Sequence, residues 1–227
     1  MDYEVARVNM IEQQIRPWNV LEMQTLNALS EIRREDFVPA QYKDLSFADV
    51  RIPIGGGSIG DGPISDGQVM LEPKVGARMV EALGLKPIHK ILEIGTGTGY
   101  LTALLATICE HVTSVEIDQQ LTRQAGMNLA MAGIINVELV QSDCFAFCHN
   151  PGEHGSQFDG VLITGSMPEI DKTFRNMINI EGCMVGIEGY NPAMQVVVYR
   201  AAGARRSLFE TSVPRLMNVD DKPSFTF

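Results

Sequence analysis

Three glycines alternate in a short stretch that could hold a ligand. Gly95, Gly97 and Gly99 follow the apolar segment 90–94 and precede residues 101–108, where apolar residues recur at helical spacing. A backbone without a Cβ atom can turn sharply, and a ligand can lie directly against it. The stretch therefore predicts a buried strand, a turn and a helix, with the free N–H groups of the helix N-terminus pointing at a ligand on the glycines.

The glycine spacing favours one kind of ligand over another. A dinucleotide site needs Gly-x-Gly-x-x-Gly, whereas this loop reads Gly-x-Gly-x-Gly and has Tyr100 where that site needs a small residue. S-adenosylmethionine has no pyrophosphate, but it has a carboxylate for backbone N–H groups and cationic centres that a nearby acid favours. The loop therefore predicts S-adenosylmethionine as the cofactor, although tight packing alone could also explain a glycine turn after a strand. The predicted contacts in the loop come from Glu93, Gly95, Thr96, Gly97 and Gly99.

Two further acids come at the ends of the strands predicted next along the chain. Glu116 lies in the strand predicted over 112–118, and Asp143 ends the strand predicted over 136–143. An acid at the end of the second strand of such a sheet can accept hydrogen bonds from both hydroxyls of a ribose. We expect Glu116 to take that role and Asp143 to accept from the adenine amino group. The predicted cofactor contacts at these two positions are completed by Ile117 and Cys144.

The elements that must position these residues alternate along the chain from residue 74 onward. Strands are predicted over 90–94, 112–118, 136–143, 158–165 and 183–189, and helices over 74–83, 101–108, 119–132 and 168–180. An antiparallel pair over 194–200 and 207–213 closes the pattern, and residues 145–157 are expected to be a loop. This alternation predicts an α/β fold with a doubly wound, mostly parallel, Rossmann-like sheet and a C-terminal antiparallel hairpin.

The segment before the sheet predicts helices and then a loop. Apolar stripes indicate helices over 1–16 and 21–33, which we expect to cap the sheet edge or the site. Residues 55–67 hold six glycines and one proline, so they cannot form a helix or an inner strand. They are expected to be a lid or a surface insertion. We expect one domain over 1–227, divided into a helical cap (1–54), a glycine-rich acceptor-side loop (55–73) and a cofactor-binding α/β core (74–227).

Composition bounds the class of protein and its partners. The chain is 45% hydrophobic and 20% charged, and its net charge is −10. These values are typical of a soluble globular protein, and neither a signal peptide nor a membrane-spanning run is apparent. Because so acidic a chain repels phosphate backbones, we expect no nucleic-acid partner. We also expect no membrane partner and a cytoplasmic location.

The cysteines raise one alternative, a metal site. Cys144, Cys148, His149 and His154 lie within eleven residues and could ligate zinc. Structural zinc sites usually draw their ligands from two separated pairs. We therefore expect no metal, and small buried thiols beside a loop, which are typical of a reducing cytoplasm.

The motifs together resemble the protein-L-isoaspartate O-methyltransferase family of class I methyltransferases. The similarity covers Arg-Glu-Asp-Phe-Val-Pro at 34–39, the glycine stretch at 92–103, and the segments 115–117 and 142–144. Gly67, Gln68 and Pro73 bracket the acceptor-side motif of the family, Gly-Gln-Thr-Ile-Ser-Gln-Pro. Inside that motif the chain departs, because Leu71 stands where the family has its serine.

The resemblance implies methyl transfer from S-adenosylmethionine to a carboxylate of a damaged protein or peptide, in the course of protein repair. It places Gln68 and Leu71 on the acceptor side and identifies no further catalytic residue. A carboxylate acceptor is already ionised at neutral pH, so it needs no general base. Because of Leu71, two alternatives stay open: a methyltransferase with a small-molecule acceptor, and a cofactor-binding module that has lost its chemistry.

Overall fold

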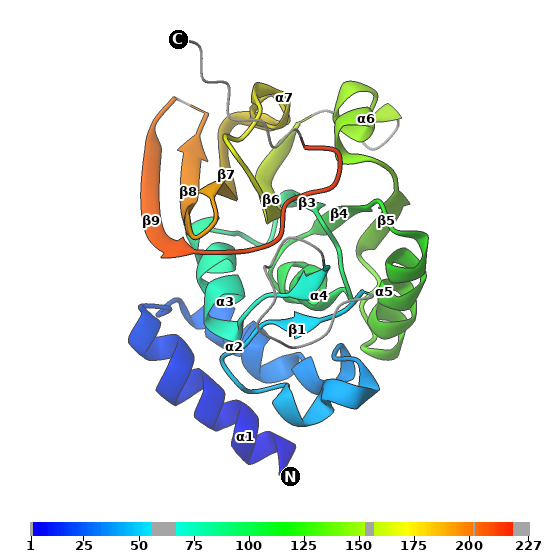
Figure 1. Ribbon diagram of the computed structural model, residues 1–227, viewed down its shortest axis with the longest axis vertical. Coiled ribbons are helices and arrows are strands. Elements are labelled where there is room, and N and C mark those ends of the chain that lie inside the picture. Colours follow the sequence, from blue (N-terminus) through cyan, green and yellow to red (C-terminus); the bar gives the residue numbers. More distant parts are fainter. Residues whose placement is uncertain (1, 56–66, 153–156, 202, 220–227) are drawn as a thin grey trace.

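The computed structural model describes residues 2–55, 67–152, 157–201 and 203–219. In this part of the chain a seven-stranded sheet forms the centre, in the order β5-β4-β3-β6-β7-β8-β9 (Figure 1). Its strands are β3 (Lys90–Ile94), β4 (His111–Glu116), β5 (Val137–Gln141), β6 (Phe158–Met167), β7 (Ile178–Tyr190), β8 (Ala193–Arg200) and β9 (Arg205–Thr211). The strands β3 to β7 are parallel, and β8 pairs antiparallel with both β7 and β9. The predicted mostly parallel sheet with an antiparallel end is confirmed.

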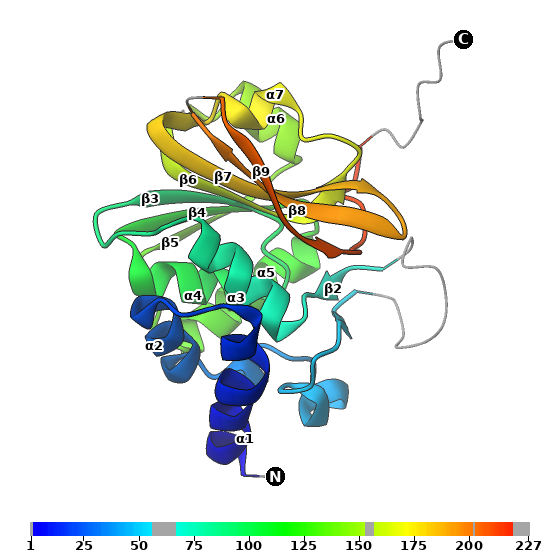
Figure 2. The ribbon, with the colours of Figure 1, turned by 90° about the vertical axis from the view of Figure 1, so that its left-hand side faces the viewer.

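Helices cover both faces of the sheet. They are α3 (Pro73–Ala82), α4 (Tyr100–Ile108), α5 (Gln119–Met131), α6 (Cys144–His149) and α7 (Lys172–Arg175). Figure 2 shows the sheet edge-on, with α3, α4 and α5 on one face and α6 and α7 on the other. The strand β3 serves both layers: Ile91 belongs to one buried cluster, while Leu92 and Ile94 belong to the other. This alternation explains why apolar residues of the strand occupy both of its faces.

The N-terminal segment packs outside the α3–α4 layer (Figure 2). It contains α1 (Tyr3–Met10), which continues as a π-helix (Ile11–Ile15) and a 3-10 turn (Arg16–Trp18), and then α2 (Met23–Glu31). Two 3-10 turns follow (Arg34–Asp36 and Ala40–Leu45), before the short pair β1 (Ile52–Pro53) and β2 (Val69–Met70). The two predicted helices are therefore present with shorter α-helical bounds. The helical path of the first ends in the 3-10 turn that contains Pro17.

Two local predictions were wrong. The segment 145–157 was expected to be a loop, but α6 begins at its start because the Asp143 carboxylate accepts from the N–H groups of Phe145 (2.9 Å) and Ala146 (3.0 Å). A helix was expected over 168–180, but α7 is a single short helix that ends at Arg175. The chain then enters the sheet, where Ile178 pairs with Phe158. The pairing of β7 with β6 therefore overrides the local helical pattern.

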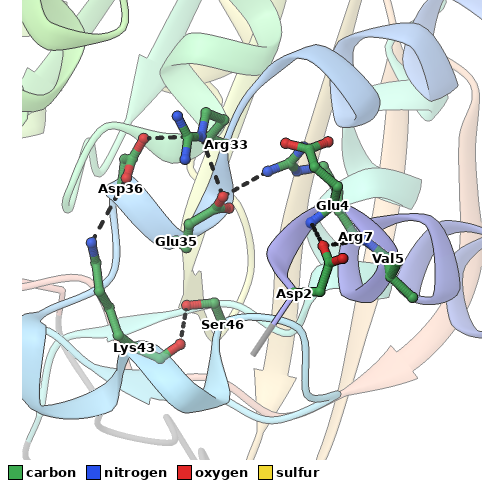
Figure 3. A network of polar contacts seen from close by, with 9 residues as sticks. All are labelled: Asp2, Glu4, Val5, Arg7, Arg33, Glu35, Asp36, Lys43 and Ser46. Carbon is green, nitrogen blue, oxygen red and sulfur yellow. Dashed lines mark hydrogen bonds and ion pairs between the residues drawn. The ribbon is translucent and has the colours of Figure 1, made fainter.

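A buried ion pair joins α1 to the turn after α2 (Figure 3). The Arg7 and Glu35 side chains have exposed fractions of 4% and 0%, and Arg7 Nη2 lies 2.6 Å from Glu35 Oε1. Arg33 Nε approaches the same oxygen from the surface at 3.4 Å. Because both main partners are removed from water, each depends on the other to compensate its charge.

None of the described helices is both long and apolar enough to cross a membrane.

Breaking the buried pair should destabilise the protein far more than breaking a surface pair. Glu35→Gln removes the buried counter-charge of Arg7 and leaves the guanidinium only the exposed Glu4, 2.8 Å from Nη1, so we expect the free energy of unfolding to fall by about 3 kcal/mol. The control is Glu12→Gln, which breaks the exposed Arg16–Glu12 pair and should cost no more than about 0.5 kcal/mol. Urea unfolding measures both, and equal effects of the two substitutions would contradict the ion pair's structural role.

Candidate active site

The glycine turn predicted from the sequence is a bent connection between β3 and α4. Gly95, Gly97 and Gly99 all have positive φ angles, of 92°, 56° and 89°. A side chain at Gly95 would collide with Thr164, and a Cβ at Gly97 would lie 2.9 Å from Ile54 Cδ1. The glycines are therefore required both by the backbone conformation and by the close approach of neighbouring side chains. We call residues 95–99 the elbow.

The Glu116 carboxylate connects the elbow to the tip of β4. Its Oε2 accepts from the N–H of Gly97 at 2.9 Å, and its Oε1 accepts from the N–H of Asp118 at 3.0 Å. The residue is 6% exposed, and burial raises the pKa of its carboxyl group. Since each carboxylate oxygen has more than one acceptor direction, Glu116 can fix the elbow and still accept from a ligand.

Glu93 lies behind the elbow and does not line its cavity. Its Oε2 accepts from the hydroxyls of Thr102 and Ser114, the latter at 2.6 Å, and the Thr96 and Ser114 hydroxyl oxygens are also 2.6 Å apart. Its other oxygen, Oε1, is buried without a hydrogen-bond partner. Burial raises the pKa of Glu93 to about 7. The predicted direct cofactor contact is therefore replaced by a hydroxyl network that holds α4 and β4 together.

Two cavities flank the elbow, separated by Ile54 and Gln68, which line both. The first cavity brings together six of the predicted site residues: Gln68, Leu71, Gly95, Gly97, Glu116 and Ile117. The second lies beside the start of α4, where Thr98 and Asp118 contribute to its wall. The helix N-terminus has no side-chain hydrogen bond at its cap, Gly99. The first cavity therefore offers the Glu116 carboxylate and apolar walls, and the second lies beside the N-terminus of α4.

Asp143 and Cys144 are not among the residues that line the two cavities. Asp143 caps α6 through Oδ1, and its Oδ2 accepts from Asn218 Nδ2 at 2.9 Å. Cys144 is buried in the cluster beneath α6. The Ser142 N–H donates to the Glu116 carbonyl at 3.0 Å, so Asp143 follows a residue that is bonded directly to Glu116. The predicted contacts of Asp143 and Cys144 with the cofactor stay predictions.

The C-terminal segment forms a wall of the first cavity that was not predicted from the sequence. After β9 the chain crosses the tip of β6 (Figure 1), where the Ser166 N–H donates to the Pro214 carbonyl at 3.0 Å and the Leu216 N–H donates to the Ser166 carbonyl at 3.1 Å. Leu216 packs against Gly165. The wall residues from this segment are Pro214, Arg215, Leu216 and Met217.

The acceptor-side residues are positioned by a buried arginine. Leu71 is 6% exposed and lines the first cavity. Its carbonyl accepts from Arg34 Nη2 at 2.8 Å, and Arg34 Nε donates to the Ser46 carbonyl at 2.8 Å. The guanidinium also lies over the Tyr100 ring, 4.8 Å from its centroid. Arg34 therefore connects the start of α4 to the backbone of the acceptor-side segment.

The zinc alternative receives no support from the described residues. All four cysteines are buried with free thiols, and burial raises the pKa of Cys144 and of Cys148 to about 12. Such thiols are poor sources of the thiolate that zinc binds. No group of three or more potential metal-ligating side chains comes together in the described part of the chain, and His154 lies outside it.

Comparison with known proteins identifies relatives over most of the chain. The family model described as Protein-L-isoaspartate(D-aspartate) O-methyltransferase (PCMT) matches residues 6–211. Protein-L-isoaspartate O-methyltransferases of Pectobacterium carotovorum and Koribacter versatilis are both 31% identical to the chain. The first match covers 87% of the chain and 88% of the relative, and the second covers 88% and 85%.

Two experimental structures share the fold. A protein-L-isoaspartate O-methyltransferase matches with a TM-score of 0.72 at 21% identity, over 94% of this chain and 65% of that one. A Plasmodium falciparum structure that carries the same family name, in complex with S-adenosyl-L-homocysteine, also gives a TM-score of 0.72, at 14% identity and over 95% and 98% of the two chains. At these identities the matches establish the Rossmann-like methyltransferase fold.

The raised pKa of Glu93 should make stability depend on pH. The folded pKa of about 7 lies above the ordinary glutamate pKa of 4.5, so the folded state binds the proton more tightly than the unfolded state. Protonated Glu93 therefore stabilises the folded state fully below pH 4.5. This contribution to the free energy of unfolding, about 3 kcal/mol in total, is lost as the pH rises through 7. We expect Glu93→Gln, which cannot ionise, to lack this loss.

Urea unfolding between pH 5 and pH 8 measures the effect. The difference in stability between wild type and Glu93→Gln should shift in favour of the variant as the pH rises, whereas the exposed Glu110→Gln should follow the wild-type profile. Parallel profiles for wild type and Glu93→Gln would show that Glu93 is ionised throughout.

Proposed function

Because the chain belongs to the protein-L-isoaspartate(D-aspartate) O-methyltransferase family, we propose that it transfers a methyl group from S-adenosylmethionine to an isoaspartyl carboxylate of a protein or peptide. The observation that carries this proposal is the convergence, in one cavity, of the elbow, the Glu116 carboxylate and the acceptor-side segment. The match to the family model includes all three.

The residues around the elbow have the chemistry that the cofactor needs. The Glu116 carboxylate would hold the ribose hydroxyls, and the apolar side chains of Ile117 and Leu121 would contact the adenine. Backbone N–H groups at the start of α4 would bind the cofactor's carboxylate. When bound, S-adenosylmethionine supplies a methyl carbon already activated by its sulfonium, and transfer leaves a neutral ester and a neutral thioether.

The protein's task is then alignment of the acceptor and exclusion of water. A carboxylate acceptor is ionised at neutral pH, because its reference pKa is about 4, so no proton has to be removed. The cavity agrees with this, since its described lining contains neither histidine nor lysine nor tyrosine. Leu71, Leu216 and Met217 contribute apolar surface that displaces water from the site.

The acceptor-side leucine favours a second candidate, a methyltransferase for a small molecule. The Leu71 side chain forms an apolar part of the cavity wall, at the position where the resemblance places the family's serine hydroxyl. A wall of this kind would suit an apolar acceptor better than an isoaspartyl carboxylate. A third possibility, a cofactor-binding module without chemistry, rests on the same residue.

Methyl transfer to a synthetic isoaspartyl peptide tests the proposed function. Radiolabelled methyl groups from S-adenosylmethionine should enter the isoaspartyl peptide as base-labile esters, and the matched aspartyl peptide should remain unlabelled. No transfer to the isoaspartyl peptide, with S-adenosylhomocysteine binding intact, would exclude this acceptor. Leu71→Ser then separates the alternatives: gained transfer indicates a degenerate repair enzyme, and no gain indicates a different acceptor or role.

Removal of the Glu116 carboxylate should weaken cofactor binding. We expect Glu116→Ala to reduce the affinity for S-adenosylhomocysteine by roughly 1–3 kcal/mol, because the ribose hydroxyls lose a charged acceptor. Calorimetry measures the affinity, and the exposed Glu110→Ala serves as the control. An unchanged affinity for Glu116→Ala would mean that the ribose lies elsewhere.

A further inference from the structure

The first cavity contains a cation whose place in the proposed reaction has not been assigned. We propose that Arg215 binds the carboxylate of the methyl acceptor and so makes the site specific for anionic acceptors. The inference rests on the proposed function, because it assigns a role to a residue of the same site.

The sheet order separates the cofactor side of the cavity from the acceptor side. The connections reverse direction beside β3, which lies between β4 and β6, and ligands of such sheets bind across this point. Glu116 at the tip of β4 marks the side of the nucleoside. An acceptor must therefore approach from the tips of β6 and β7, where Arg215 lies beside Ser166 and Gly189.

Charge distinguishes Arg215 from the other residues on the acceptor side. Among the described residues that line the first cavity, Glu116 and Arg215 are the two that carry a charge. A carboxylate that leaves water for a partly apolar cavity loses hydration, and this loss has to be offset by a cation or by hydrogen bonds. Leu71 offers no hydrogen bond in its side chain and Gln68 offers a neutral amide, so the Arg215 guanidinium is the cation among the described lining residues that can compensate the acceptor's charge.

The guanidinium of Arg215 is held in place before any acceptor binds. Its Nη1 donates to the Gly189 carbonyl at 2.8 Å and lies 3.4 Å from Ser166 Oγ, while Cζ lies 5.2 Å from the centroid of the Tyr190 ring. A guanidinium has five N–H donors in a rigid plane, so contacts to the protein and to a carboxylate can coexist. A cation fixed in this way loses little conformational freedom when it binds an acceptor.

A purely structural role for Arg215 is the competing explanation. The same contacts could serve only to fasten the C-terminal segment to the tips of β6 and β7. Arg51 provides a control, because it donates to the Ser212 carbonyl of the same segment and lines neither cavity; its other partner is Glu72, whose Oε1 lies 3.3 Å from Arg51 Nε. Loss of either arginine removes an anchor, but only loss of Arg215 removes a charge from the cavity.

The test compares a carboxylate with its neutral counterpart. Binding to the S-adenosylhomocysteine complex is measured by calorimetry for an isoaspartyl peptide and for the same peptide with the free α-carboxylate converted to a carboxamide. We expect wild type and Arg51→Gln to bind the carboxylate peptide about 10- to 100-fold more tightly than the carboxamide, the range expected for a hydrogen bond to a charged group. Arg215→Gln should lose this preference while keeping its affinity for the carboxamide peptide and for S-adenosylhomocysteine, and Arg215→Lys should recover part of it.

The outcomes separate this inference from the proposed reaction. If wild type does not prefer the carboxylate, or if Arg215→Gln keeps the preference, Arg215 does not bind the acceptor. Methyl transfer to the same isoaspartyl peptide tests the reaction independently. A carboxylate preference that depends on Arg215, together with absent transfer, would support the assignment of Arg215 and exclude isoaspartyl methylation.

Discussion

The hydrogen bond from the Gly97 N–H to the Glu116 carboxylate is the contact on which the rest of the site depends. It ties a turn of three glycines with positive φ to the tip of the neighbouring parallel strand. The Asp118 N–H binds the other oxygen of the same carboxylate, so one side chain fixes the elbow and the start of the next connection together. Behind this contact, Glu93 joins Thr102 of α4 to Ser114 of β4. The position of the elbow is thus set by two buried acids: Glu116 lines the first cavity, and Glu93 supports the backbone behind the elbow.

On the acceptor side, the backbone is fixed independently of the side chain at position 71. Arg34 donates to the carbonyl of Leu71 rather than to its side chain, and the guanidinium is held in turn by Ser46 and by the face of Tyr100. The contact that positions the segment therefore does not depend on the side chain at position 71, whereas the leucine side chain forms part of the cavity wall. The Arg215 guanidinium, brought in from the C-terminus, supplies a charge at the same cavity.

Those parts of the fold and site that depend on neighbouring residues could be predicted from the sequence. The elbow and its flanking strand and helix follow from glycine spacing and apolar periodicity, and Glu116 was found because it comes at the tip of the next strand. Asp143 was recognised as an acid at the end of a strand. That its side chain caps the N-terminus of α6 was not predicted, and this contact sets the position of the carboxylate. Other contacts of the site join residues that are far apart in the chain. They are the cavity wall formed by Arg215 and Leu216 and the hydrogen bond from Arg34 to Leu71. Hydrophobic periodicity and motif spacing report on neighbouring residues, so they could not predict these contacts. The true extent of β7 was missed for the same reason, because its pairing with β6 overrides the helical pattern before it.

A crystal structure of the complex with S-adenosylhomocysteine would show whether Glu116 binds the ribose. We expect both ribose hydroxyls to lie within hydrogen-bond distance of the Glu116 carboxylate, at about 2.5–3.0 Å, while Gly97 keeps its bond to the same side chain. The adenine should then lie against Ile117 and Leu121. A nucleoside bound with its ribose away from Glu116, or an elbow that stays covered by Ile54 in crystals containing the ligand, would contradict the account.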